Sequence, residues 1–304
     1  MDKYLIIIVT YNRKMLLEEC VTNALGQTIP ADKIVIVNNA STDGTQEYLQ
    51  TDFFKNDKFR IIHCKENIGG AGGFYRGMKA ALNYDVDWLL VIDDDAILET
   101  DYTEKIFAVL QDQKDYRAAA GIVMTDGYID KHHRRNLSKY GMILKTINDK
   151  FYKKTSFACD IASFCGMMIR TELVKKIGLP HAEYFIFHDD TEYSLRILKY
   201  SKFLVVSDAI LNHKTKIAVE KNPRRYTWKD YYEIRNKIFY IKEHGNIFDI
   251  VINSLEIFTH KVFRNCLFAI IKRDDYDWKY EKETTYKAIR DGIKGKKYIE
   301  VEKR

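Results

Sequence analysis

The chain has 304 residues, 46% of them hydrophobic and 30% charged, with a formal net charge of +6 and a pI near 8.8. This length allows one large α/β domain with an appendage or two modest domains. The mildly basic charge favours phosphorylated ligands or an anionic membrane surface, and it argues against a nucleic-acid-binding protein. The five scattered cysteines contain no C-x-x-C pair, which argues against a thiolate zinc site or a disulfide framework and favours the cytoplasm.

The first 125 residues alternate short apolar runs with helical patterns. The apolar runs predict strands at residues 5–9, 33–37, 59–63, 88–92 and 118–124. Helical patterns lie between them at about residues 14–25, 44–54, 71–82 and 102–113. Such alternation is typical of an α/β fold with a mostly parallel sheet that helices cover on both sides. In such sheets, ligands bind at the carboxyl ends of the strands.

Polar clusters follow the first three predicted strands. Thr10, Tyr11 and Asn12 follow the first strand, and Asn39 follows the second with its neighbour Asn38. Taken singly, each is more often a turn former or a helix cap than a ligand contact. The third strand leads into residues 67–77, where four glycines occupy five positions. Backbone amides at a helix start there could face phosphate or sugar, and the alternative is a flexible connection.

Three carboxylates, Asp93, Asp94 and Asp95, follow directly on the fourth predicted strand. Side chains alternate faces on an extended chain, so Asp93 and Asp95 are predicted to point the same way. Two such carboxylates repel each other unless a cation lies between them, and oxygen ligands suit Mg²⁺ or Mn²⁺. The alternative is a solvated acidic turn.

The second half of the sequence adds two further candidates. After an irregular β excursion at 125–157, where His132 and His133 are predicted to be solvated, Asp189 and Asp190 form a pair at a helix start. Asp190 is either a cap or a general base. A strand at 203–206 is expected to end in a loop before His213, which is a metal ligand or a structural histidine.

Three long helical patterns follow, at about residues 229–244, 247–271 and 278–293. The middle pattern has a broad apolar face, but charged residues interrupt it, so it is too polar to span a bilayer. Such a face could rest on a membrane surface, lie in a homodimer interface, or close the core of the catalytic domain.

Taken together, the motifs resemble those of the family 2 inverting glycosyltransferases, which have the GT-A fold. The resemblance covers about residues 3–215 and rests on the segments 9–13, 37–45, 93–95 and 188–193, in the family's order and spacing. The glycine-rich segment 67–74 is similar to the branch that contains galactofuranosyltransferases and some rhamnosyltransferases of bacterial cell-surface polysaccharides.

The resemblance implies a role for each candidate. Asp93, Asp95 and His213 would hold Mn²⁺ or Mg²⁺, and Asp190 would be the catalytic base. Asn39 stands where most family members carry Asp. The residues implied to bind the donor are Thr10, Tyr11, Asn12, Asn39, Gly70, Gly72, Arg76, Asp93 and Asp94.

The resemblance also implies an organisation and partners. A GT-A catalytic domain at 1–215, with its donor part at about 1–125 and its acceptor and catalytic part at about 126–215, would precede a helical region at 216–304. The donor would be a UDP- or dTDP-linked sugar, and the acceptor a saccharide or lipid-linked saccharide at the inner face of the membrane. The alternatives are a metal-dependent nucleotidyltransferase and a catalytically silent subunit of polysaccharide assembly.

Overall fold

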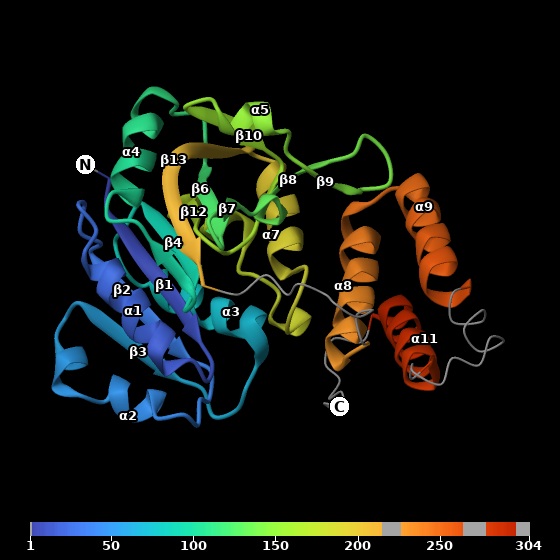
Figure 1. Ribbon diagram of the computed structural model, residues 1–304, viewed down its shortest axis with the longest axis horizontal. Helices are drawn as coiled ribbons and strands as arrows, with labels where there is room; N and C mark the ends of the chain where they lie inside the picture. Colours follow the sequence, from blue (N-terminus) through green and yellow to red (C-terminus); the bar gives the residue numbers. More distant parts are fainter. Residues whose placement is uncertain (1, 215–225, 264–277, 296–304) are drawn as a thin grey trace. The chain divides into compact units, whose positions relative to one another are not determined.

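The structure is a computed structural model that describes residues 2–214, 226–263 and 278–295 (Figure 1). The chain divides into two compact units. The sheet unit comprises residues 1–136, 145–182 and 190–217, and the helical unit comprises 137–144, 183–189 and 218–304. Two short segments from within the predicted catalytic range, 137–144 and 183–189, therefore belong to the helical unit.

The sheet unit is built on a ten-stranded sheet with the order β10-β13-β6-β12-β4-β1-β2-β3, in which β5 also pairs with β13 and β7 with β6. The strands are β1 (Tyr4–Thr10), β2 (Lys33–Asn38), β3 (Phe59–His63), β4 (Trp88–Asp93), β5 (Ala96–Leu98), β6 (Ala118–Thr125), β7 (Tyr128–Ile129), β10 (Ser156–Cys159), β12 (Met167–Arg170) and β13 (Phe203–His213). A small second sheet has the order β11-β8-β9, formed by β8 (Arg134–Leu137), β9 (Leu144–Thr146) and β11 (Ile161–Ala162).

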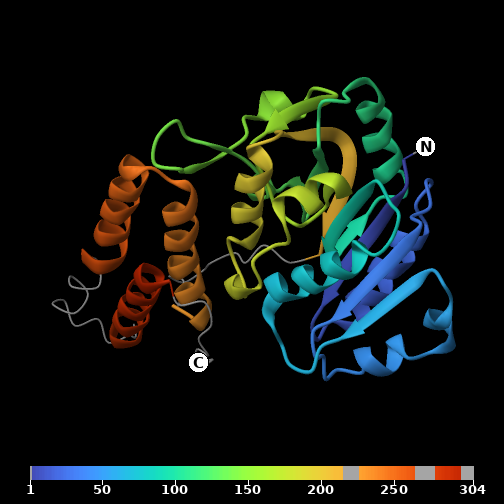
Figure 2. The same ribbon diagram turned by 180° about the vertical axis from the view of Figure 1, so that it is seen from behind.

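The strands predicted from the apolar runs are confirmed, and β4, β1, β2 and β3 pair in parallel (Figure 2). The sheet is nevertheless mixed, because β12 lies antiparallel between β4 and β6. The prediction that the last strand ends at residue 206 is wrong. Strand β13 continues past a register shift between Val206 and Ile210 and runs to His213, since its second half pairs with β5 and β6.

Helices cover both faces of this sheet because side chains of β1 alternate between them. Tyr4, Ile6 and Ile8 pack with α1 and α4, whereas Leu5, Ile7 and Val9 pack with α3, α6 and α7. The helices and 3₁₀ turns are α1 (Lys14–Leu25), α2 (Thr45–Leu49), η1 (Asp52–Lys55), α3 (Gly69–Ala81), α4 (Tyr102–Asp112), η2 (Lys131–His133), α5 (Asp149–Tyr152), α6 (Thr171–Ile177), η3 (Ala182–Tyr184) and α7 (Asp189–Leu198). The helix predicted at 44–54 is thus two shorter elements, α2 and η1.

The helical unit contains α8 (Trp228–His244), α9 (Ile247–Ile257), the π-helical segment η4 (Phe258–Phe263) and α11 (Trp278–Lys294). Capping boxes at Thr227 and Asn246 begin α8 and α9. Helices α8 and α11 pack together, and Tyr231 of α8 donates a hydrogen bond to Asp291 of α11 at 3.1 Å. Of the helix predicted at 247–271, the part beyond residue 263 lies outside the described residues. Within those residues, no helix combines the length and apolar character that crossing a membrane requires.

Candidate active site

The acidic run closes strand β4 and turns into β5. Asp93 is the last residue of β4, and Asp94 and Asp95 form the turn before Ala96. Asp93 is partly buried, whereas Asp94 and Asp95 are buried. Burying adjacent carboxylates is costly unless neighbouring groups compensate their charge. The contacts of this turn therefore determine what it can bind.

Asp94 holds the loop that follows β1 in place through hydrogen bonds. Its carboxylate accepts hydrogen bonds from Thr10 Oγ1 at 2.7 Å, from the Tyr11 backbone amide at 3.4 Å and from Arg13 Nη1 at 3.2 Å. Burial raises the pKa of Asp94 to about 6, although Thr10 and Arg13 oppose that shift. Two residues implied to bind the donor, Thr10 and Asp94, are thus bonded to each other, and the side chain of Tyr11 beside them is exposed.

Arg13 is a site residue to which sequence reasoning gave no role of its own. Its Nη1 pairs with both Asp94 and Asp95. Burial alone lowers the pKa of Arg13, but the charges of Asp95, Asp94 and Asp93 outweigh it and raise that pKa. The signal that could have found Arg13 is its place just after β1, because β1 is the strand beside β4.

His213 reaches the acidic turn because of strand pairing. In the antiparallel pair of β13 and β5, His213 is opposite Ala96, the residue after Asp95. His213 Nε2 lies 3.4 Å from Asp95 Oδ1, and the Lys214 amide donates to the Asp95 carbonyl at 2.8 Å. Burial lowers the pKa of His213, but the hydrogen bond and charge of Asp95, with the charge of Asp93, raise it above its ordinary value overall.

The side chains implied to hold a metal fit a divalent cation by their chemistry. Asp93 and Asp95 offer carboxylate oxygens, which both Mg²⁺ and Mn²⁺ accept, and His213 offers an imidazole nitrogen beside them. The net rise in the pKa of His213 means that this corner favours positive charge. A cation there would share one carboxylate, Asp95, with Arg13.

A second histidine lies against His213. The rings of His133 and His213 are 5.2 Å apart, edge to face. His133 Nδ1 lies 2.7 Å from Ser163 Oγ, and its Nε2 lies 3.5 Å from Asp130 Oδ2. The prediction that both His132 and His133 are solvated is therefore wrong for His133, whose side chain is 16% exposed against 84% for His132.

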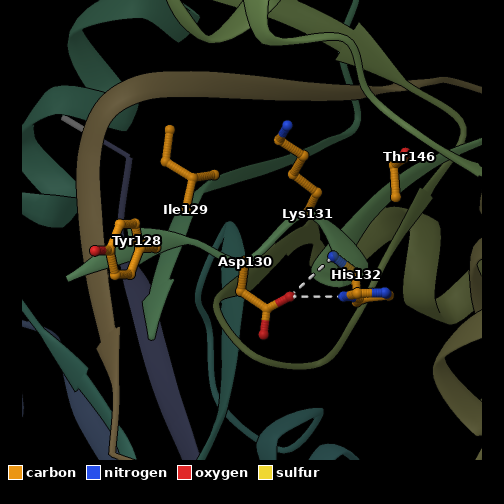
Figure 3. A pocket seen from close by; sticks show the side chains of 6 residues that line it. All are labelled: Tyr128, Ile129, Asp130, Lys131, His132 and Thr146. Carbon is orange, nitrogen blue, oxygen red and sulfur yellow. Dashed lines mark hydrogen bonds and ion pairs between the residues drawn. The ribbon is translucent and has the colours of Figure 1, made fainter. Parts of the chain in front are cut away.

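Asp130 also borders a surface pocket. This cavity has a volume of about 310 Å³ (Figure 3). Asp130 Oδ1 accepts a hydrogen bond from the His132 amide at 3.0 Å and lies 3.1 Å from His132 Nδ1. The pocket is lined by Tyr128, Ile129, Asp130, Lys131, His132 and Thr146. It therefore lies next to the histidine pair and on the part of the chain predicted to meet the acceptor.

Asn39 and Asn12 organise the loops after β1, β2 and β3. Asn39 is buried, its Nδ2 donates to Asn67 Oδ1 at 2.9 Å and to the Gly69 carbonyl at 3.0 Å, and its Oδ1 accepts from the Ile68 amide at 3.0 Å. Asn12 Oδ1 accepts from the Thr42 amide at 2.7 Å. The amide of Asn39, implied to contact the donor, is thus engaged with the start of α3.

The glycines of α3 differ in what they touch. A Cβ at Gly73 would lie 2.5 Å from Val9 Cγ1, and one at Gly77 would lie 2.4 Å from Ile7 Cγ2, so these two let α3 approach the sheet. A Cβ at Gly72 would meet the side chain of Ile68. At Gly70 the space is open. Of the two glycines implied to bind the donor, only Gly70 has open space where a Cβ would lie.

Arg76 lies one turn further along α3 and is exposed. Burial raises the pKa of the neighbouring Cys64 thiol, and the charge and hydrogen bond of Arg76 reduce that rise. The four cysteines within the described residues, Cys20, Cys64, Cys159 and Cys165, are buried free thiols.

Asp190 is the second residue of α7 and is partly buried. Its Oδ1 accepts hydrogen bonds from the Thr191 amide at 2.5 Å and from Thr191 Oγ1 at 3.1 Å. Among the residues that the structure describes, none donates a hydrogen bond to Oδ2. Further along α7, Ser194 Oγ donates to the Ala162 carbonyl at 2.9 Å and fixes the helix to the sheet unit. Asp190 thus keeps one carboxylate oxygen that can take a proton.

Known proteins have sequences similar to that of this chain. The profile "Glycosyl transferase family 2" matches residues 5–178. Galactofuranosyltransferase GlfT1 of Mycolicibacterium smegmatis is 23% identical over 199 residues, which cover 64% of this chain and 64% of that protein. The dTDP-rhamnosyl transferase RfbF of Shigella flexneri is 24% identical over 251 residues, which cover 78% of this chain and 79% of RfbF. The match thus spans less than two thirds of the length of GlfT1.

A solved structure supports the fold. The crystal structure of GalNAc-T7 with UDP, GalNAc and Mn²⁺ superposes with a TM-score of 0.61 at 14% identity, over 80% of this chain and 48% of that one. The matched region of the family profile runs from β1 to α6 and contains Thr10, Asn39 and the acidic run. The chain therefore belongs to glycosyl transferase family 2 and has the GT-A fold predicted from its motifs.

Proposed function

We propose that this chain is an inverting, metal-dependent glycosyltransferase that moves a hexosyl unit from a nucleotide-diphospho-sugar to a growing cell-surface polysaccharide or glycolipid. The contact between His213 and Asp95, at the turn where Asp94 holds the loop after β1, carries this proposal. Through this contact, side chains that can bind a metal lie at the carboxyl end of the sheet, where ligands bind in α/β folds. Galactofuranose and rhamnose are favoured, because two relatives are named for transferring these sugars.

On the donor side, Asp93, Asp95 and His213 would hold Mn²⁺ or Mg²⁺, and Mn²⁺ accompanies UDP in the crystal structure of GalNAc-T7. A metal bound there would supply Lewis-acid chemistry, offsetting the charge that builds on the departing diphosphate. Tyr11 and Asn12 belong to the loop after β1, and Gly70 and Arg76 to the first turns of α3, where exposed backbone amides suit an anionic ligand. Asn39 supports the donor site by holding the start of α3 in place.

On the acceptor side, Asp190 is the general base. A hydroxyl is a poor nucleophile at neutral pH, so a carboxylate about 3 Å away must take its proton during attack. Oδ1 is held by Thr191, which leaves Oδ2 for the proton. One in-line displacement inverts the anomeric centre, and no protein nucleophile is required.

The alternatives are a nucleotidyltransferase and a silent assembly subunit. A nucleotidyltransferase would use the carboxylates at the end of β4 but would have no use for a base at Asp190. A silent subunit would have no reason to keep Asp93, Asp95, His213 and Asp190 together with the family's fold.

A screen of nucleotide sugars, with and without Mn²⁺, tests the proposal. UDP-galactofuranose, dTDP-rhamnose, UDP-galactose and UDP-glucose are incubated with the full chain, and release of nucleoside diphosphate is measured. Metal-dependent release from one donor, raised by a saccharide acceptor, is expected. Release of pyrophosphate from a nucleoside triphosphate would instead favour the nucleotidyltransferase, and no turnover of any of these would favour the silent subunit.

We also propose that α9 provides a contact surface, either for the inner face of the cell membrane or for a second copy of the chain. A stripe of large apolar side chains on this helix and the turn after it is exposed: Ile247, Phe248, Val251, Leu255 and Phe258. Exposed apolar patches of this kind are typical of membrane or protein contact surfaces.

A further inference from the structure

The loop before α7 has an unusual backbone. Phe185, Phe187 and His188 all have positive φ angles, of 63°, 65° and 63°. Residues with a Cβ rarely adopt this left-handed region, and they remain in it only where the surroundings hold them. The loop leads directly into Asp189 and Asp190, the first two residues of α7.

One buried side chain of α8 holds this loop. Asn236 Nδ2 donates to the backbone carbonyls of Tyr184 at 2.8 Å, Ile186 at 2.9 Å and Phe187 at 2.8 Å. An amide nitrogen has two hydrogens, so three acceptors must share them. Asn236 is fully buried, and replacing it leaves three buried or partly buried carbonyls without this donor.

The neighbouring Arg235 orients that amide. Its Nε and Nη2 donate to Asn236 Oδ1 at 2.9 and 2.7 Å, which turns the NH₂ group of Asn236 toward the loop. Arg235 Nη2 also donates to the Glu183 carbonyl at 2.6 Å. Burial lowers the pKa of Arg235, and the rings of Tyr232 and Phe239 lie against its guanidinium. A fully buried arginine is costly, so its contacts indicate a specific task.

We propose that Arg235 and Asn236 are positioning residues that fix the direction in which α7 starts and thereby the place of Asp190. This inference rests on the proposed role of Asp190 as the base. Ser194 fixes the middle of α7 to Ala162, whereas the loop that Asn236 holds leads directly into the first turn. A displacement of a catalytic group by about 1 Å can cost ~10²-fold in rate.

The test compares two buried asparagines of the helical unit. Asn236→Ala removes the donor to the loop before α7. Asn253→Ala is the matched control, because Asn253 is equally buried and its Nδ2 donates to the Gly141 carbonyl at 2.7 Å, in a different loop. Both variants should lose thermal stability to a similar extent. Only Asn236→Ala should lower kcat, by ~10²-fold, with the KM for the donor and the affinity for nucleoside diphosphate unchanged.

A second variant, Arg235→Lys, keeps the positive charge but loses the fork that orients Asn236, and should lower kcat by a smaller factor. If Asn236→Ala does not fold, the kcat of Arg235→Lys tests the inference instead. An equal kcat in Asn236→Ala and Asn253→Ala, or a full kcat in Arg235→Lys when only that variant folds, would overturn the inference. If Asp190→Asn keeps full transfer, the base assignment fails and this inference with it. If Asp190→Asn is inactive while Asn236→Ala keeps its kcat, the inference fails alone.

Discussion

Arg13 pairs with Asp95, and the same nitrogen of its guanidinium also bonds Asp94. A protein cation thus pairs with Asp95, one of the two carboxylates predicted to hold a metal ion. Two adjacent buried carboxylates need such compensation, because burial disfavours their charged forms. Arg13 and a bound divalent ion would serve the same electrostatic need from different sides of Asp95.

Arg13→Gln should therefore lower the melting temperature in the absence of metal. Removing the partner of a buried carboxylate costs roughly 1–3 kcal/mol. Added Mn²⁺ should recover more stability in this variant than in the wild type, because the ion supplies the missing positive charge. Scanning fluorimetry with and without Mn²⁺ measures both effects. Lys14→Gln, which removes the neighbouring charge paired with Glu18 at 3.8 Å, is the control and should change neither. An equal Mn²⁺ shift in Arg13→Gln and wild type would contradict the shared role.

Asp93→Ala and Asp95→Ala should weaken the metal-dependent binding of nucleoside diphosphate, since a divalent ion bridges protein carboxylates to phosphate. His213→Ala should have a smaller effect of the same kind. Titration calorimetry with UDP or dTDP and Mn²⁺ measures it. Unchanged affinity in both aspartate variants would reduce the acidic run to a structural turn.

Asp190→Asn should abolish transfer and leave donor affinity intact, because the amide has the shape of the carboxylate but cannot accept the proton of the acceptor. Loss of a general base typically costs ~10²–10⁴-fold in rate. Initial rates with the donor identified by the screen measure this. Asp112→Asn, at an exposed position at the end of α4, is the control. Transfer within about tenfold of wild type would rule out the base assignment.

Gly77→Ala should destabilise the sheet unit, because its Cβ would lie 2.4 Å from Ile7 Cγ2. Such overpacking costs typically about 1–3 kcal/mol. Gly70→Ala is the matched change in the same helix, and it should not lower the melting temperature because its Cβ meets nothing within 4 Å. Weaker donor binding in Gly70→Ala would support its place in the donor site, and unchanged binding would remove it from that site.

The apolar stripe of α9 should bind anionic vesicles or a second copy of the chain. Flotation with vesicles, beside light scattering for mass, tells these apart. The double variant Phe248→Ser, Leu255→Ser should lose whichever contact is found, whereas Met15→Ser, at an exposed position in the sheet unit, should not. A wild-type monomer that does not float with vesicles would show that the stripe serves neither purpose.

The parts of the fold that can be predicted are those whose hydrophobic pattern lies within one short stretch of sequence. Strands β1, β2 and β4 are buried on both faces and read as continuous apolar runs, which is the pattern of a central parallel sheet. The direction of β12 has no such signal, because its short apolar run, Met167 to Ile169, reads the same in either direction. The extension of β13 to His213 was missed for a related reason, since partly exposed residues near the register shift interrupt its apolar pattern.

The site was predictable in its residue types but not in its contacts. The run of carboxylates can be recognised in the sequence. Nothing in the sequence around Arg13, however, indicates that the side chain of Arg13 contacts Asp95. His132 and His133 are adjacent in sequence, and the sequence does not indicate that His133 packs against Ser163 and His213 while His132 is exposed. The glycine-rich segment predicts a ligand contact or a flexible connection, whereas the structure shows that Gly73 and Gly77 serve the packing of α3 against β1.

The pairing of β13 with β5 has a consequence for how the site forms. Asp95 lies in the first half of the sheet unit, whereas His213 lies near its end, so their contact closes a very long loop of chain. Contacts of this kind form late in folding, because their loop-closure entropy is offset only after the intervening sheet exists. During synthesis, β1 to β4 can assemble before β13 leaves the ribosome. The proposed metal site would then be completed only after β13 has emerged, so that an unfinished chain would have the proposed donor-binding edge without His213 beside Asp95.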